Sequence, residues 1–374
     1  METPAFLTGL SKRQWRLAEV CRSLAENENV FVSAKDVLSV VACDDGDMDE
    51  ETFEEECEEL SCGVGAIEDY DLESVGYFYR LLLQMGQVWR NRYPLIDLAG
   101  ISGDFFDEQP FGPESVEVRY SKNANILFLE DKPPLLPISL LNGLTLSDGS
   151  AVPSHHLEEL WMGMEHLRQE PDLPLSELME VIPGPDFGMG GIVGGFDEIY
   201  DFYKKGEAYL SVRGQIDTIL DGGRTRIAIR SLPHGVLLKP VLQQINALQE
   251  KECCPPFILK RNVDGAALNI IIDMGPQISA DELKALLYKE TDLERTIHFR
   301  CGFKDNAGWI IEGPLITVLK AANALCSTAW TQKNGTELDY APFIRDVIKF
   351  GKFKNPLYRL IDERRTTLLR SKPS

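Results

Sequence analysis

Carboxylates are the most concentrated chemical groups in this chain. Between Asp44 and Glu73 the sequence has fifteen Asp and Glu residues and no Lys or Arg. Clustered carboxylates can bind Mg²⁺, but an uninterrupted acidic run is more typical of a solvated, flexible segment, because like charges repel one another. We therefore predict a flexible acidic insert at 44–69 in preference to a metal site.

Sulfur and glycine offer weaker signals. The eight cysteines include one adjacent pair, Cys253-Cys254, with no second pair at zinc-site spacing and no nearby His. A chain of 374 residues does not depend on disulfides for its core, so we predict thiols. The glycine-rich segment 188–195 lacks dinucleotide-site spacing, and neither a P-loop nor an H-E-x-x-H motif is present. No metal or nucleotide site is expected in this chain.

The net charge of −21 describes mainly the acidic segment. Without that segment the net charge is −6, and residues 341–374 contain nine basic and three acidic residues. The average charge therefore does not exclude a DNA-binding groove elsewhere. The chain has no stretch of about 18 apolar residues and no signal peptide, so we expect a cytoplasmic protein without membrane contact.

The elements that must position these groups begin with short helices. Apolar spacing predicts a helix within 8–25, with Thr8 as a candidate N-cap, and Ser33 is a candidate cap before the short apolar run 37–41. A strongly apolar helix is expected at 77–88, and 116–129 alternates like a strand. This order fits a winged-helix arrangement. The proline-rich stretch 131–137 predicts a domain boundary.

The second half of the sequence alternates strands with helices. Helices are predicted at 156–167, 238–248 and 281–288, the last capped by Ser279, and a strand at 269–274. Strands at 209–216 and 224–230 are predicted to pair through the turn Asp221-Gly222-Gly223. Basic residues on and near these strands form either a solvated face or the lining of a DNA groove: Lys204, Lys205, Arg213, Arg224, Arg226 and Arg230.

Three motifs occur together in an order and spacing that resemble a known family. They are RYPLID at 92–97, PGPDF at 183–187 with GGIVGG after it, and LPHGVLLK at 232–239. The family is that of the A subunits of type IIA DNA topoisomerases, DNA gyrase and topoisomerase IV. The resemblance implies an α+β multidomain fold: a winged-helix DNA-binding domain at 1–130, a tower domain at 131–335, and the beginning of a truncated coiled coil at 336–374.

The resemblance also implies a reaction. In this family a tyrosine that follows an arginine attacks a DNA phosphodiester and holds the broken strand covalently. Here the corresponding pair is Arg119-Tyr120, within Val118-Arg119-Tyr120-Ser121-Lys122. Tyr120 would be the nucleophile, and Arg119 would stabilise the phosphoryl charge. The alternative is that Tyr120 is a half-buried strand tyrosine.

Six further residues form the DNA-binding set that the resemblance implies. Arg13 and Arg16 belong to GLSKRQWR, which is similar to the family's G-L-K-P-V-H-R-R. The others are Lys35 before the apolar run 37–41, His155 in VPSHHL, Lys239 beside LPHG, and Leu146 as a minor-groove wedge. A helix-start role for His155 and a core role for Leu146 remain alternatives.

The family's phosphate-contacting Y-H-P-H-G-D departs most from this chain. The ungapped equivalent is Tyr70-Asp71-Leu72-Glu73-Ser74-Val75, where carboxylates replace both histidines and would repel DNA phosphates. Two hypotheses follow. The first is a topoisomerase subunit that binds and cleaves duplex DNA with an ATPase subunit of the B type, which supplies Mg²⁺ and ATP; a homodimer is expected to be weakened by a missing distal gate. The second is a non-catalytic paralogue with a DNA-binding or regulatory role, whose acidic insert mimics phosphate.

Overall fold

The described part of the chain forms two compact units. The computed structural model describes residues 10–25, 30–44, 48–61, 74–100, 102–103, 110–121, 124, 136–221, 224–250, 257–264, 267–274, 278–305, 309–334 and 367–369. Unit 1 comprises Met1–Asn142, Phe303–Ile311 and Ala321–Tyr340, and unit 2 comprises Gly143–Gly302, Glu312–Lys320 and Ala341–Ser374. The predicted boundary near 131 and most of 336–374 lie outside the described residues.

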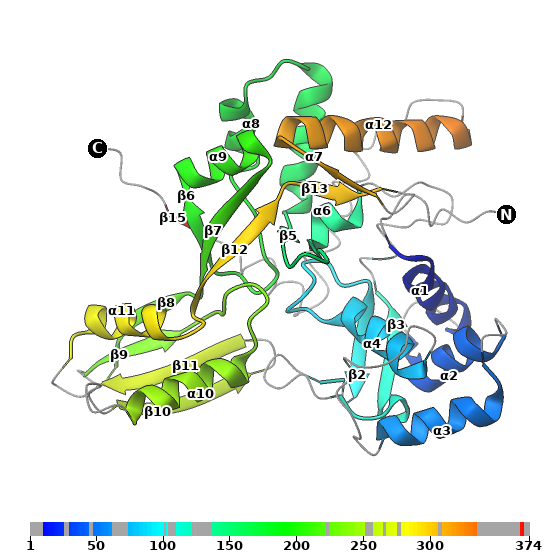
Figure 1. The fold of residues 1–374 in the computed structure, drawn as a ribbon, viewed down its shortest axis with the longest axis horizontal. Helices are drawn as coiled ribbons and strands as arrows, with labels where there is room; N and C mark the ends of the chain where they lie inside the picture. The colour runs from blue at the N-terminus through cyan, green and yellow to red at the C-terminus, as the bar shows by residue number, and fades with distance from the viewer. Residues whose placement is uncertain are drawn as a thin grey trace. The chain divides into compact units, whose positions relative to one another are not determined.

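Unit 1 consists of short helices around an antiparallel sheet in the order β1-β3-β2 (Figure 1). Helices α1, α2 and α4 contact one another, and α1 and α2 also contact the central strand β3. The bounds are α1 (Lys12–Leu24), β1 (Val32–Ser33), α2 (Ala34–Ser39), the π-helical turn η2 (Val40–Asp44), α3 (Glu50–Ser61), α4 (Val75–Gly86), β2 (Ile96–Gly100), the 3₁₀ turn η4 (Pro113–Ser115), β3 (Val116–Tyr120), α6 (Ile138–Asn142) and β13 (Gly302–Lys304) with β14 (Ile310–Glu312).

Local side-chain chemistry explains where the first helices begin. Ser11 accepts a hydrogen bond from the Gln14 amide, and the Gln14 side chain accepts one from the Ser11 amide, which together satisfy two donors at the start of α1. Ser33 accepts from the Lys35 amide, as predicted. Thr8 lies outside the described residues.

The acidic insert is folded over part of its length, and the prediction of a flexible segment is wrong for residues 50–61. Phe53, Cys57 and Leu60 recur at helical spacing and are buried, so α3 is amphipathic. It packs against α2, α4 and η4. The burial of this apolar stripe outweighs the repulsion among the carboxylates on the opposite face.

Unit 2 is built on two antiparallel-rich sheets among the described residues. One has the order β15-β6-β7-β12-β5-β4, and the other has the order β10-β11-β9-β8. The bounds are β4 (Leu144–Thr145), β5 (Ala151–Val152), α7 (Leu157–Gln169), α8 (Leu175–Val181), β6 (Ile192–Gly195), α9 (Phe196–Lys205), β7 (Glu207–Arg213), β8 (Ile216–Asp221), β9 (Arg224–Ile229), α10 (Leu238–Gln249), β10 (Phe257–Asp264), β11 (Ala267–Met274), α11 (Ala280–Glu290), β12 (Glu294–Arg300) and β15 (Thr367–Leu369).

The predicted pairing of 209–216 with 224–230 is wrong for residues 209–213, whereas Ile216 at the end of the segment pairs with Ile229 as predicted. The first strand ends at Arg213, and the Gly214 amide then donates to the Leu293 carbonyl. A Cβ at Gly214 would lie 2.4 Å from the Ser231 carbonyl oxygen, so a side chain does not fit there without a shift. Strand β7 instead pairs with β6 and β12, and the next strand, β8, forms the hairpin with β9. Asp221 pairs with Arg224, so the hairpin lies where the turn was predicted, and Gly222 and Gly223 themselves lie outside the described residues.

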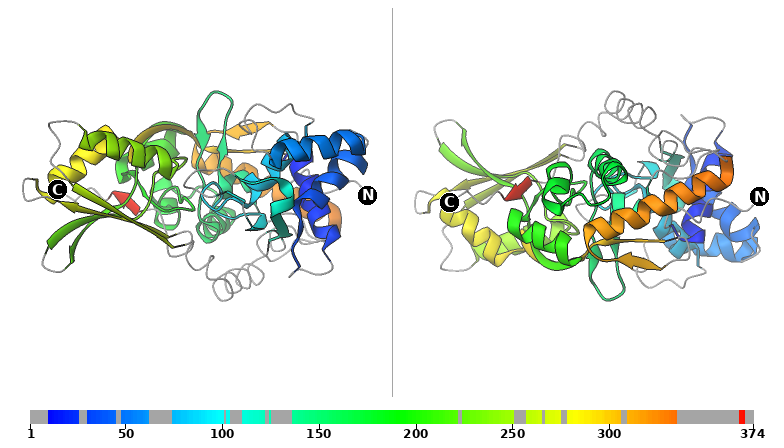
Figure 2. Two further views of the ribbon diagram at one scale, coloured as in Figure 1. Left: turned by 90° about the horizontal axis from the view of Figure 1, so that it is seen from below. Right: turned by 90° about the horizontal axis from the view of Figure 1, so that it is seen from above.

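Helices α10 and α11 lie on one face of the sheet formed by β8 to β11 (Figure 2). Ser279 caps α11 as predicted: its hydroxyl accepts from the Glu282 amide, and the Glu282 carboxylate accepts from the Ser279 amide. After β14 the chain continues as α12 (Leu315–Asn334). Among the described residues no helix is long and apolar enough to cross a membrane.

Candidate functional site

The Arg119-Tyr120 pair lies at the end of the central strand of unit 1. Along β3 the residues alternate between buried and more exposed positions, with Val116, Val118 and Tyr120 buried. Directly after it, Ser121 donates through its hydroxyl to the Pro94 carbonyl and through its amide to the Leu95 carbonyl. The strand end is therefore fixed against the RYPLID segment that carried the resemblance.

Tyr120 faces the protein interior, with 5% of its surface exposed. Burial raises the pKa of its phenol well above the ordinary value, and the nearby Arg22 only partly opposes this effect. The Arg22 guanidinium lies 5.9 Å from the ring centroid. A buried, protonated phenol is a poor nucleophile, so this conformation does not present Tyr120 for attack on a phosphodiester.

Arg119 is held by an acidic partner from the same motif region. Its Nη2 donates to Asp97 Oδ2 at 2.6 Å and its Nε donates to the same oxygen at 3.2 Å. The two residues are directly opposite each other on β3 and β2, and both side chains are less than one fifth exposed. The Phe31 ring lies 4.4 Å from the guanidinium. A DNA phosphate would have to compete with Asp97 for this cation.

The predicted cations on α1 and α2 also contact other groups. The Arg13 guanidinium lies 5.5 Å from the ring centroids of both Tyr77 and Phe78 on α4. Arg16 is partly exposed on α1. Lys35 Nζ forms a 2.6 Å ion pair with Glu54 on α3, and this hydrogen bond raises the Lys35 pKa.

The start of α4 is the place where the family's phosphate-contacting motif would lead into its helix. Residues 70–73 of the predicted equivalent lie outside the described residues. Ser74 caps the helix by accepting from the Tyr77 amide. The Val75 amide donates to Glu56 Oε2 at 2.7 Å, so a carboxylate from α3 occupies the helix N-terminus.

Two of the three motifs behind the resemblance, PGPDF and LPHG, meet in unit 2. The Asp186 amide of PGPDF donates to the Ser154 carbonyl, and the Ser154 hydroxyl donates to the Asp186 carbonyl, both at 2.8 Å. The Phe187 ring stacks on His234 of LPHG with centroids 4.6 Å apart. These contacts join residues 32 and 47 positions apart, so the two motifs and the segment before α7 belong to one packed core.

His155 and Leu146 occupy different environments in unit 2. His155 is buried, and its Nε2 lies 3.0 Å from the Tyr203 hydroxyl, an arrangement that suits a structural role. Leu146 follows β4 in the hairpin that returns through β5, where its amide donates to the Ser150 carbonyl. Leu146 is partly exposed.

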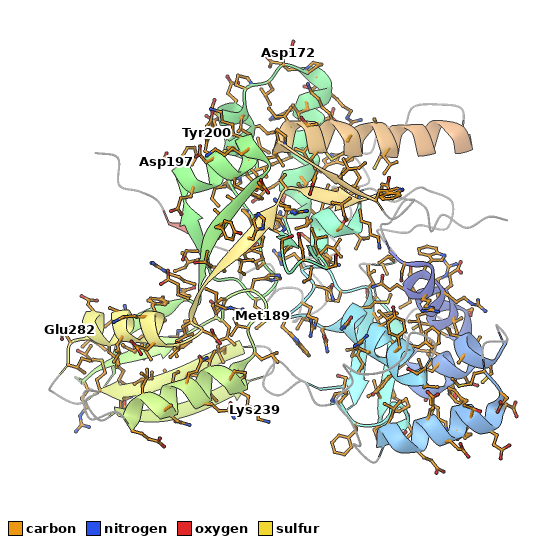
Figure 3. The ribbon with its side chains drawn as sticks, viewed as in Figure 1. Asp172, Met189, Asp197, Tyr200, Lys239 and Glu282 are labelled. Carbon is orange, nitrogen blue, oxygen red and sulfur yellow. The ribbon has the colours of Figure 1, made fainter. Side chains whose placement is uncertain are left out.

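Lys239 is exposed in the first turn of α10, where Figure 3 labels it. Other basic residues predicted on the strands have acidic partners within unit 2. Arg213 pairs with Glu294 at 2.8 Å, Arg230 with Asp217 at 3.3 Å, and Arg226 with Asp273. On α9, Lys205 pairs with Asp201 at 2.6 Å. Much of the predicted basic face is therefore charge-compensated.

Sequence reasoning did not identify Asp97, Glu54, Glu56 or Arg22 as residues of this region. The apolar spacing of Phe53, Cys57 and Leu60 within the acidic run would have indicated a packed helix. The partners of Glu54 and Glu56 could not be predicted from local sequence, because Lys35 and Val75 are each 19 residues away from the glutamate that they contact. Among the described residues, no group of three or more His, Cys, Asp and Glu side chains could hold a metal ion.

Comparison with known proteins identifies the same part of the chain that contains PGPDF and LPHG. Residues 132–320 match the family described as the A subunit of DNA gyrase/topoisomerase IV. The A subunit of DNA topoisomerase 4 from Bacillus subtilis (strain 168) is 30% identical over 278 residues, covering 67% of this chain and 34% of its own. The A subunit of DNA gyrase from Kosmotoga olearia is 30% identical over 242 residues, covering 58% and 30%.

The A subunit of DNA topoisomerase 4 from Streptococcus pyogenes (serotype M1) is 26% identical over 277 residues, covering 67% of this chain and 34% of its own. The chain thus spans about a third of the length of these curated relatives. The family match covers half of the chain and includes the PGPDF and LPHG blocks that pack together in unit 2. By this match, the chain belongs to the family of DNA gyrase/topoisomerase IV A subunits.

Proposed function

We propose that this chain binds duplex DNA in the manner of a topoisomerase A subunit, but does not cut it while Tyr120 is packed as in the structure. In this proposal unit 1 is a winged-helix domain, in which α1, α2 and α4 pack around the sheet β1-β3-β2. Unit 2 is a tower domain, with Lys239 exposed and Leu146 partly exposed. Family membership supports duplex DNA as the partner.

The burial of Tyr120 carries the second half of the proposal. Transesterification requires the tyrosine oxygen to reach a phosphorus atom and to lose its proton as the new bond forms. With 5% of Tyr120 exposed and its pKa raised by burial, neither requirement is met. Arg119, the group expected to stabilise the phosphoryl charge, is paired with Asp97. These observations favour the non-catalytic hypothesis.

Cleavage remains the second candidate because two guanidinium groups lie next to the candidate nucleophile. Arg22 lies over the Tyr120 ring, and Arg119 precedes Tyr120 in the chain. If Tyr120 left its packed position, either cation could stabilise a phenolate or a phosphorane. This candidate assigns Mg²⁺ and ATP to a partner of the B type and requires the chain to pair with a second copy.

One experiment separates the two candidates. The chain and its Tyr120→Phe variant are each incubated with a cognate B-type subunit, supercoiled plasmid, Mg²⁺ and ATP, and covalent complexes are trapped with detergent. We expect both proteins to bind duplex DNA with an affinity that falls as salt rises, and neither to form a covalent complex. A covalent complex that appears only with Tyr120 present would establish cleavage instead. Absence of duplex binding at low salt would contradict both candidates.

A further inference from the structure

Helix α3 places two glutamates on positively polarised groups of unit 1, the Lys35 ammonium and the N-terminus of α4. The helix is anchored by the buried side chains of Phe53, Cys57 and Leu60, and it packs against α2 and α4 (Figure 1). Glu54 and Glu56 project from this anchored helix to α2 and α4 respectively. The glutamates therefore have defined positions.

The first of these interactions is at the N-terminus of α4. The Val75 amide, at the first residue of the helix, donates to Glu56 Oε2 at 2.7 Å. The first amides of a helix have no partners within the helix and carry a partial positive charge, which attracts carboxylates and phosphates alike. Glu56 thus fills a position that would suit a phosphate oxygen equally well.

The second interaction neutralises a cation. Lys35 Nζ lies 2.6 Å from Glu54 Oε2, and both side chains are partly exposed to solvent. An exposed ion pair of this kind contributes little stability and exchanges readily for another anion. Around it, the outer face of α3 presents further exposed glutamates, among them Glu51, Glu55 and Glu58. These exposed charges are screened by solvent and salt, so they oppose DNA less than the two docked carboxylates do.

We propose that α3 is an autoinhibitory segment that competes with DNA phosphates for the α4 N-terminus and for Lys35. The proposal rests on the proposed function, since it presumes that unit 1 binds duplex DNA. In the closed state the carboxylates of Glu54 and Glu56 take the place of two phosphates. DNA binds tightly only when both carboxylates are displaced, and the affinity of the chain for DNA is therefore set by how firmly α3 is docked.

The test uses a variant that removes the two charges but keeps the shape of the side chains. In Glu54→Gln/Glu56→Gln an amide oxygen can still accept from Val75, so the helix can remain docked, but it no longer competes as an anion. The matched control is Glu55→Gln/Glu58→Gln, which removes the same charge from exposed positions of the same helix. Affinity for a 30-base-pair duplex is measured against salt for all three proteins.

We expect Glu54→Gln/Glu56→Gln to bind at least about tenfold more tightly than the unaltered chain, and the control at most about twofold more tightly. The slope of log affinity against log salt should also steepen by about one to two units in the first variant, because each further phosphate that the protein neutralises adds about 0.9. Equal increases in affinity for the two variants would show a general charge effect and overturn the inference.

A second measurement detects the displacement itself. Hydrogen exchange of residues 50–61 in the unaltered chain should rise when the duplex is added, because α3 leaves its docked position. Lys35→Gln should weaken DNA binding more in the Glu54→Gln/Glu56→Gln background than in the unaltered chain, where Lys35 is already occupied. DNA binding that leaves the exchange of α3 unchanged overturns the inference while the proposed function stands. If none of these proteins binds DNA, the proposed function itself is wrong.

Discussion

Ion pairs in the two units can be compared by the elements that supply the acidic partner. In unit 2 the acidic partners come from adjacent strands or from one helical turn away, as in Arg213 with Glu294 and Lys205 with Asp201. In unit 1 Arg119 likewise pairs with Asp97 on the adjacent strand, whereas Lys35 pairs with Glu54 from another helix, in the acidic segment. Pairs of the first kind follow from strand register and helix geometry. The second kind depends on how α3 packs.

The same contrast holds for helix N-termini. Helix α11 is capped by its own residues, Ser279 and Glu282, and Glu282 is labelled in Figure 3. At α4, Ser74 provides a local cap, but the Val75 amide bonds to Glu56 from another helix. Helix α11, like α1 in unit 1, is thus capped by its own local sequence, whereas the N-terminus of α4 also carries a carboxylate from another helix.

The largest expected effect concerns the docking of α3. Phe53→Ala should cost about 3–5 kcal/mol of stability in unit 1, because it leaves a cavity under a buried aromatic side chain. Hydrogen exchange of α3 and α4 amides measures the loss. The exposed Glu55→Ala on the same helix should change stability by no more than about 0.5 kcal/mol. Similar values for the two variants would mean that α3 is not packed.

An intermediate effect on stability is expected when the acidic partner of one ion pair in each unit is replaced. Asp97→Asn should destabilise unit 1 by about 1–2 kcal/mol, because it leaves the half-buried Arg119 with a weaker partner. The control is Asp217→Asn in unit 2, where the pair with Arg230 is longer and about twice as exposed, so the expected loss is below about 1 kcal/mol. The comparison is made by chemical denaturation followed by hydrogen exchange in each unit. A larger loss of stability for Asp217→Asn than for Asp97→Asn would contradict this prediction.

Removal of one local helix cap should cost less stability than removal of the buried Phe53 side chain that anchors α3. Ser279→Ala removes the hydroxyl that accepts from the Glu282 amide, and should cost about 1 kcal/mol, confined to α11. Ser176→Ala, at an exposed position within α8, is the control and should be nearly neutral. Exchange of the α11 amides measures both. An effect that spreads to unit 1 would contradict the local character of this cap.

The smallest effect is the pH response of the Lys35–Glu54 pair. The hydrogen bond from Glu54 raises the pKa of Lys35 above its usual 10.5. Because the folded-state pKa is the higher one, the contribution of this pair is fully present below pH 10.5 and is lost as pH rises through the folded value. A ¹⁵N NMR titration of the lysine Nζ checks this. Glu54→Gln should return Lys35 to its ordinary pKa, and an unchanged value in that variant would exclude Glu54 as the cause.

Several elements could be predicted because their signals are short-range. Ser33 and Ser279 cap the helices that follow them, and the turn after Asp221 joins two paired strands. The pairing of 209–216 with 224–230 was mostly wrong because alternation does not show where one strand ends and the next begins: β7 ends at Arg213 and pairs with β6 and β12, and β8 begins at Ile216. The prediction of a flexible insert was wrong for residues 50–61 because it was based on charge alone. Three apolar residues in this segment, Phe53, Cys57 and Leu60, are buried and determine how the helix packs.

The sequence by itself determined the family, since PGPDF, LPHG and RYPLID retain their order and spacing, and it identified Arg119-Tyr120 as the pair to consider. Only the tertiary structure decided the state of that pair. The alternation of β3 turns Tyr120 inward, and the register of β2 against β3 places Asp97 opposite Arg119. Burial and charge pairing depend on residues brought together from distant parts of the chain, and no local pattern encodes those distances.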